Sequence, residues 1–68
     1  MNMTNVESSN VLAVGYDNGT LEVHFHSGGK YQYFDVPASV YENFLNADSK
    51  GKFLHYNIKN KYRYRRLN

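Results

Sequence analysis

The sequence predicts an α+β domain in which a three-stranded antiparallel β-meander precedes two helices. Three observations support this class. In the first half of the chain, apolar and polar residues alternate on both sides of an Asn-Gly pair, which is typical of a β-hairpin. A Gly-Gly turn then leads into a third alternating segment. After Pro37, the apolar residues instead recur at helical spacing.

The first two strands are predicted over residues 10–16 and 20–26. Asn18-Gly19 between them suits the two-residue turn in which both residues have positive φ. The pairs that this turn predicts are Asp17–Thr20, Tyr16–Leu21, Val14–Val23 and Leu12–Phe25. One face of the hairpin is then apolar and carries Leu12, Val14, Tyr16, Leu21, Val23 and Phe25. The other face carries Val11, Ala13, Gly15, Glu22, His24 and His26.

The third strand is predicted over residues 30–34, and the length of the preceding loop decides which way its side chains point. A three-residue loop puts Tyr31 and Tyr33 on the apolar face, whereas a two-residue loop puts them beside His24 and His26. Three-residue loops that contain Gly are common, and Tyr is often half-buried in a core. The core position is therefore favoured, and the other register stays open.

Two helices are predicted over residues 37–47 and 49–60. Pro37 suits a first helical turn, and the apolar residues that follow it share one face: Val40, Tyr41, Phe44 and Leu45. Asp48 or Ser49 can cap the second helix, on which Leu54 and Ile58 face the core. The opposite side carries Lys52, Tyr56, Lys59 and Arg63, with His55 beside them. Beyond residue 60, the pattern fits either a short final strand with Tyr62 and Tyr64 inward or a frayed tail.

All 68 residues are expected to form one domain, with residues 1–5 disordered and residues 61–68 as a basic C-terminal segment. The first ten residues are polar and do not resemble a signal peptide. The longest uncharged run, residues 8–16, is too short to span a membrane. Cysteine is absent, which fits a cytoplasmic protein.

Charge is segregated along the chain. Seven of the eight basic residues lie in the last nineteen positions: Lys50, Lys52, Lys59, Lys61, Arg63, Arg65 and Arg66. The six acids all precede them: Glu7, Asp17, Glu22, Asp35, Glu42 and Asp48. Tyr62 and Tyr64 are interleaved with the basic residues. A basic, Tyr-containing segment without acids favours a polyanionic partner, nucleic acid first.

Several short motifs together resemble the KTSC domain, a small domain also found at the C-terminus of some lysyl-tRNA synthetases. The motifs are Ser8-Ser9-Asn10, Gly15-Tyr16-Asp17, Phe25-x-x-Gly28-x-x-Tyr31-x-Tyr33, Val36-Pro37, Val40-Tyr41, Ala47-x-Ser49-x-Gly51 and Ile58-x-x-x-Tyr62. The resemblance spans residues 6–62. One departure is Phe53-Leu54-His55, where the family tends to show an aromatic pair followed by Asn. The resemblance implies a small α+β domain of bacterial or phage origin, for which RNA binding is a suggested role.

Catalytic and metal sites are weakly supported. His24-x-His26 puts two imidazoles on one side of a strand, but the ligand set of a metal site is incomplete, so exposed strand histidines are the favoured interpretation. Neither Ser8 nor Ser9 lies in a nucleophile-elbow pattern. Gly28-Gly29 is followed by neither Lys-Ser/Thr nor a helix start, as a phosphate-binding loop requires. We therefore expect no enzyme activity, no metal and no cofactor.

The leading functional interpretation is a non-catalytic module that binds nucleic acid, RNA in particular. The residues expected to contact phosphates are Lys52, Lys59, Lys61, Arg63, Arg65 and Arg66. Tyr56 and Tyr64 are expected to stack on bases, and Tyr31 and Tyr33 join them only in the two-residue-loop register. The alternative is a protein-interaction module whose basic end docks on an acidic partner. A solvated charged surface without a partner is the remaining interpretation of such a segment.

Overall fold

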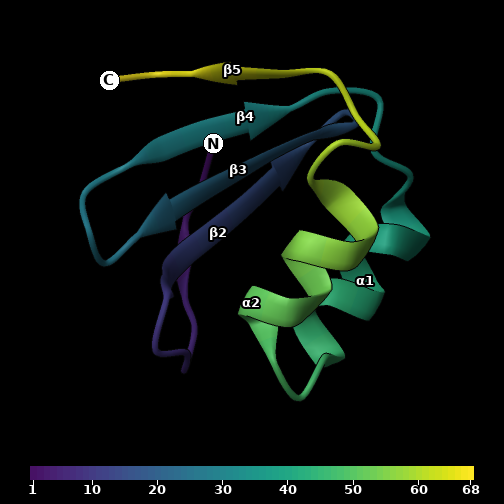
Figure 1. Ribbon diagram of the computed structural model, residues 1–68. Helices are drawn as coiled ribbons and strands as arrows, with labels where there is room; N and C mark the ends of the chain where they lie inside the picture. The colour runs from purple at the N-terminus through teal and green to yellow at the C-terminus, as the bar shows by residue number, and fades with distance from the viewer.

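The computed structural model describes residues 1–68 and shows an antiparallel sheet with helices packed against one face (Figure 1). The sheet order is β1-β2-β3-β4-β5, with bounds Thr4–Asn5, Val11–Asp17, Thr20–Phe25, Lys30–Tyr33 and Tyr64–Arg66. The helical layer consists of α1 (Ala38–Asn46), α2 (Lys50–Phe53) and the π-helix η1 (Leu54–Ile58), which continues α2. The predicted α+β class is confirmed, and the sheet has an additional strand at each edge.

The hairpin turn forms as predicted. Asn18 and Gly19 have φ values of 49° and 83°, and the pairing runs in register up to Val14 opposite Val23. Beyond that point a bulge lies between Val11 and Ala13. Because the extra residue reverses the parity of the strand, Val11 pairs with Phe25 and is fully buried, whereas Leu12 is 42% exposed. The predicted pairing of Leu12 with Phe25 is therefore wrong.

The loop between β3 and β4 has three residues, 26–28. The Phe25 N–H donates to the Gly29 carbonyl at 2.9 Å, which closes the loop at that length. Tyr31 consequently lies opposite Val23, and Tyr33 lies two residues further along on the same face. The favoured register is confirmed, and the two-residue-loop alternative is wrong.

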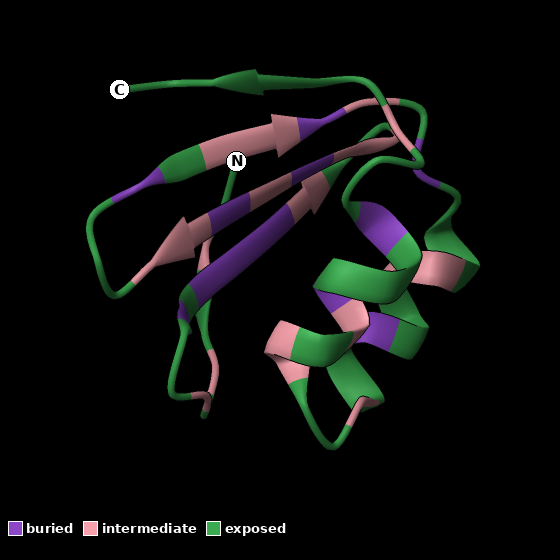
Figure 2. Ribbon diagram, in the orientation of Figure 1, coloured by how far each residue is buried: buried purple, intermediate pink, exposed green.

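The core lies between the sheet and the helices, where Figure 2 shows the buried segments of β2, β3 and the helical layer. Its buried side chains are Val11, Val14, Leu21, Val23, Tyr33, Val36, Phe44, Leu54 and Ile58. Tyr16 joins the layers at one end of this core. Its hydroxyl donates to the Val36 carbonyl at 2.5 Å, and its ring stacks on Tyr41 with centroids 4.7 Å apart.

The second helix begins where predicted but ends earlier. The Lys52 N–H donates to the Ser49 hydroxyl at 3.2 Å, so Ser49 is the cap. From Leu54 the helix widens, and the Lys59 N–H donates to the Leu54 carbonyl at 2.8 Å. The helix ends at Ile58, since Lys59 is extended, and Asn60 then turns the chain with a φ of 69°, so Arg63 does not lie on its predicted helical face. In α1, Leu45 is also exposed, contrary to prediction.

Both ends of the chain join the sheet. Thr4 pairs with Val14, and Asn5 pairs with Ala13, so the expected disorder of residues 1–5 is not observed for this strand. The residues before β1 approach Gly15 so closely that a Cβ atom on Gly15 would lie 2.6 Å from Met3 Sδ. At the other end, residues 64–66 pair with β4, which confirms the final-strand alternative. None of the helices is long and apolar enough to cross a bilayer.

Candidate functional site

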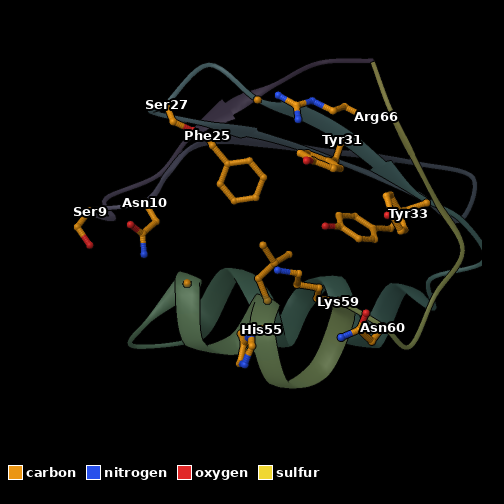
Figure 3. A pocket seen from close by; sticks show the side chains of 14 residues that line it. Ser9, Asn10, Phe25, Ser27, Tyr31, Tyr33, His55, Lys59, Asn60 and Arg66 are labelled. Atoms are coloured by element: carbon orange, nitrogen blue, oxygen red, sulfur yellow. The ribbon is translucent and has the colours of Figure 1, made fainter. Parts of the chain in front are cut away.

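A cleft of about 740 Å³ lies between the inner face of the sheet and the helix formed by α2 and η1. Figure 3 shows side chains from both layers around it, with Tyr31 and Arg66 on the sheet side and His55 and Lys59 on the helix side. Its principal lining residues are Ser9, Asn10, Phe25, Tyr31, Tyr33, His55, Lys59, Asn60, Tyr64 and Arg66. A volume of this size is in the range of pockets that take small organic ligands.

The pairing of β4 with β5 builds the aromatic wall of the cleft. Tyr31 lies opposite Arg66, and Tyr33 lies opposite Tyr64, so all four share the inner face. The Tyr64 ring centroid is 5.9 Å from that of Tyr31 and 6.0 Å from that of Tyr33. The Arg66 guanidinium lies 5.4 Å from the Tyr31 ring centroid, a cation–π distance. Phe25 completes the wall through a T-shaped contact with Tyr31, with ring centroids 5.8 Å apart.

The helical side of the cleft contributes polar and cationic groups. His55 lies in η1, and Lys59 is the first residue after η1. The wide π-helical turn that ends the helix therefore brings both residues to the cleft. Asn10 closes one end by packing against α2, where the lack of a side chain on Gly51 leaves room for its amide. The same loop carries Ser8, whose hydroxyl accepts from the backbone N–H groups of Asn10 and Val11.

The cleft is electropositive. Its lining includes Lys59 and Arg66 and no Asp or Glu. Burial raises the pKa of Tyr33, and the neighbouring Tyr31 and Tyr64 raise it further, so this hydroxyl stays protonated at neutral pH. An anion with an aromatic part suits such a site, because rings offer stacking surfaces while the cations attract the charge.

The outer face of the sheet holds a separate polar cluster. Glu22 accepts a hydrogen bond from Gln32 Nε2 at 2.8 Å, and its other carboxylate oxygen lies 2.6 Å from His24 Nε2. The hydrogen bond from Gln32 is the main cause that lowers the pKa of Glu22, opposed by desolvation and supported by His24. His26 instead contacts the Ser8 carbonyl at 3.0 Å. No three His, Cys, Asp or Glu side chains gather as metal ligands do.

Some of the predicted site residues line the cleft, and the others do not. The cleft brings together the predicted residues Lys59, Tyr64 and Arg66. Tyr31 and Tyr33 line it as well, but in the three-residue-loop register, so the expectation that they join the site only in the other register is wrong. Tyr33 is 4% exposed and acts as a wall of the cleft, whereas Tyr64 is 60% exposed and offers its ring.

The other predicted residues lie elsewhere. Lys52 is exposed on α2, and Tyr56 is 67% exposed against His55, away from the cleft. Arg65 lies opposite Gln32 on the outer face, since alternate residues of a strand point to opposite sides. Lys61 and Arg63 do not line the cleft and instead border a second hollow.

The second hollow has a volume of about 600 Å³. Its lining residues are Phe34, Asn60, Lys61, Tyr62, Arg63 and Tyr64. Asn60 and Tyr64 line the cleft as well. Phe34 and Arg63 follow the Tyr33–Tyr64 pair in the same ladder, so their side chains lie on the outer face of the sheet, as that of Arg65 does. The Arg63 guanidinium lies 5.8 Å from the Phe34 ring centroid and 3.1 Å from the Asp35 carboxylate.

The sequence interpretation missed Ser9, Asn10, Phe25 and Asn60 as site residues. Phe25 was assigned to the hairpin core, which is correct for its packing, but its ring also reaches the cleft. Ser9 and Asn10 belong to a motif of the family resemblance, and that motif was the one available signal for them. No local pattern connects residue 10 with residue 60.

The KTSC domain profile matches residues 7–62 of this chain. The chain belongs to the KTSC domain family. Among solved structures, a KTSC domain protein from Yersinia pestis superposes with a TM-score of 0.94 at 40% identity, covering 98% of this chain and 97% of that one. The five-stranded sheet with its helical layer is thus a fold that the KTSC domain adopts in a crystal structure.

Two kinds of relative resemble this KTSC domain. One kind is lysine–tRNA ligases, with 48% identity over 48 residues in Trichormus variabilis and 41% over 63 residues in a Nostoc species. The chain spans only 9% and 11% of the length of these enzymes. The other kind is small proteins, including one of Stutzerimonas stutzeri that is 40% identical and matched over 92% of its length.

Proposed function

We propose that this KTSC domain is a non-catalytic module that binds single-stranded RNA, with a base inserted in the cleft between β4–β5 and η1. The observation that carries the proposal is the lining of that cleft, where tyrosines and two cations meet without an acid. Tyr64 offers an accessible ring to a base, and the Arg66 guanidinium already lies over the Tyr31 ring. Aromatic rings and guanidinium planes are the groups on which unstacked bases pack in RNA-binding domains.

A single strand fits this site better than a duplex does. A base must leave its stack to enter a space between two protein layers, and unstacking costs least in a strand that is not paired. Lys59 and Arg66 would contact the phosphates that flank the inserted base. Ser9 and Asn10, at the closed end, offer a hydroxyl and an amide for hydrogen bonds to the base or to a 2′-hydroxyl.

RNA is favoured over DNA by the relatives. The lysine–tRNA ligases that match this chain are, by their name, enzymes that act on a tRNA. The matched part is a small fraction of each enzyme, so an accessory contact with an RNA is a fitting role for it. The lining of the cleft also holds no paired carboxylates for acid–base chemistry.

The test compares a labelled single-stranded RNA with the matching DNA, the RNA duplex and poly-glutamate over a salt series. We expect single-stranded RNA to bind best, with log affinity falling against log salt at a slope of about 1.4, or about 0.7 for each of two phosphate contacts. Arg66→Gln is expected to weaken binding by about 1.5–3 kcal/mol. Arg65→Gln is the matched control, because its side chain belongs to the same strand but points to the outer face.

Two results would overturn the proposal. If no nucleic acid binds even at low salt, the cleft does not serve RNA. If poly-glutamate binds as tightly as RNA and the Arg66 variant weakens both equally, the basic end docks on an acidic partner protein instead.

A further inference from the structure

β5 forms a free edge of the sheet. It is the last strand in the sheet order, so only one of its sides has a neighbouring strand (Figure 1). On that side, the Phe34 N–H donates to the Arg63 carbonyl at 2.9 Å, and the Leu67 N–H donates to the Lys30 carbonyl at 2.8 Å. These bonds extend the pairing with β4 over residues 63–67, so the other side of this segment is an edge that another strand can join.

The main-chain groups of Tyr64 and Arg66 point to the free side of β5. Hydrogen-bonded and non-hydrogen-bonded pairs alternate along an antiparallel ladder. The two bonds above fix this alternation, so Arg65 is bonded to β4, whereas Tyr64 and Arg66 lie in non-hydrogen-bonded pairs. No turn or loop hydrogen bond reaches the N–H or C=O groups of Tyr64 and Arg66. Each of these residues thus offers a main-chain donor and acceptor to an added strand.

Arginine side chains flank this edge on the outer face. Arg63 and Arg65 both point there, because residues two apart in a strand share a face. Arg63 lies 3.1 Å from the Asp35 carboxylate, but the two side chains are 79% and 85% exposed. Such an exposed pair is weak, so another carboxylate can take the place of Asp35. A strand that joins β5 is therefore favoured when its outward side chains are acidic.

A second copy of this chain is a poor partner for the edge. Two antiparallel β5 strands centred on Arg65 would bring the two Arg65 side chains directly opposite each other. A shift of one residue would instead oppose Arg63 to Arg65, or Arg66 to its own copy. Like charges at opposed positions destabilise a ladder, and charged edge strands are a common protection against self-pairing. The edge therefore selects against itself and in favour of an acidic strand.

We infer that the free edge of β5 pairs with an extended acidic segment of a partner protein, which extends the sheet by one strand. Acidic side chains at alternate positions of that segment lie against Arg63 and Arg65 on the outer face. Its main chain bonds to Tyr64 and Arg66. This surface is separate from the cleft, which takes its ligand on the inner face, so the inference does not rest on the proposed function.

The experiment titrates the protein at low salt with a short peptide in which Glu alternates with Val. In the expected pairing, each Val lies opposite Tyr64 or Arg66, and the Glu residues lie beside Arg63 and Arg65. We expect the Tyr64 and Arg66 amides to become protected from hydrogen exchange, whereas the Arg65 amide, already bonded to β4, changes little. N-methylation of the Val residues removes the peptide's donors to Tyr64 and Arg66 and should weaken binding by about 5- to 150-fold.

Charge variants test the preference for an acidic strand. Arg63→Gln/Arg65→Gln is expected to weaken binding of the Glu-Val peptide by about 2- to 30-fold. Lys50→Gln/Lys52→Gln is the matched control, because it removes the same charge from α2, which lies far from β5 (Figure 1). A peptide in which Lys alternates with Val should not bind. Thermal melts check that both double variants are folded.

Each contrary outcome overturns a definite part of the inference. If the Tyr64 and Arg66 amides gain no protection, or the N-methylated peptide binds as tightly as the unmodified one, no strand joins β5. If the Lys-Val peptide binds equally well, the partner is not acidic. If the protein alone dimerises and protects the same amides, a second copy occupies the edge. The effect of Arg66→Gln on RNA binding tests the proposed function separately, so either can fail without the other.

Discussion

The side-chain amide of Asn10 occupies the space that a side chain on Gly51 would fill. A Cβ atom at position 51 would lie 2.8 Å from Asn10 Nδ2, closer than such atoms approach in proteins. This contact joins the loop before β2 to the first turn of α2 and closes one end of the cleft. The two residues are 41 positions apart in the sequence (51 − 10).

The Asn10–Gly51 contact predicts a coupled pair of substitutions. Gly51→Ala in the parent is expected to destabilise the fold or leave it unchanged, because the clash offsets the helix propensity that Ala gains. In an Asn10→Ala background, the same change should stabilise by about 0.5–1 kcal/mol. Urea unfolding of the four proteins measures the coupling. Additive effects would show that Asn10 and Gly51 do not interact.

Leu12 and Leu21 are a matched test of the bulge in β2. A hairpin without the bulge buries both on one face, but Leu12 is 42% exposed and Leu21 is fully buried. Leu21→Ala is therefore expected to cost about 2–5 kcal/mol, and Leu12→Ala about 0.5 kcal/mol or less. Chemical denaturation gives both values. Equal losses would mean that the bulge is not populated in solution.

The turn at Asn18-Gly19 predicts strong substitution effects. Proline cannot adopt the φ of 49° found at Asn18, and a β-branched residue is strained at the φ of 83° found at Gly19. Asn18→Pro and Gly19→Val are each expected to lower stability by about 1–3 kcal/mol. Asn18→Gly is the control, since Gly accepts positive φ. An unchanged Tm in both strained variants would contradict the turn.

Tyr64 and Tyr56 test where bases stack. Both rings are exposed, at 60% and 67%, but only Tyr64 lines the cleft. Tyr64→Ala is expected to weaken RNA binding by about 1–3 kcal/mol without changing the salt slope, because stacking releases no counterions. Tyr56→Ala should have little effect on affinity. A larger loss at Tyr56 would move the binding surface to the outer side of η1.

Glu22 should make stability sensitive to acid. Its pKa is lowered in the folded state, mainly by the hydrogen bond from Gln32, so the native state favours the ionised carboxyl. The stabilisation is present above the unfolded value of 4.5 and is lost as the pH falls through the lower folded pKa. Glu22→Gln should therefore flatten the acid limb of the stability profile. Glu42→Gln, on the exposed side of α1, is the control, and equal profiles would contradict this role for Glu22.

Much of the architecture could be predicted from short-range patterns in the sequence. Alternation and the Asn18-Gly19 turn determined the hairpin register from Asp17 to Val14, because turn chemistry and side-chain parity act between near neighbours. Leu54 and Ile58 were correctly assigned to the core for the same reason, since residues four apart share a helical face. The KTSC resemblance was carried by residues in chain order and needed no tertiary information.

Tertiary structure decided the bulge, the β1 pairing and the composition of the cleft. Arg65 and Arg66 are adjacent and chemically identical, and only the pairing of β5 with β4 places Arg66 inside and Arg65 outside. The cleft likewise joins Asn10, Tyr31 and Lys59, which no short-range preference connects. Sequence patterns report the preferences of neighbouring residues, whereas such a site depends on which distant surfaces bury one another, and that is determined by the packing of the whole chain.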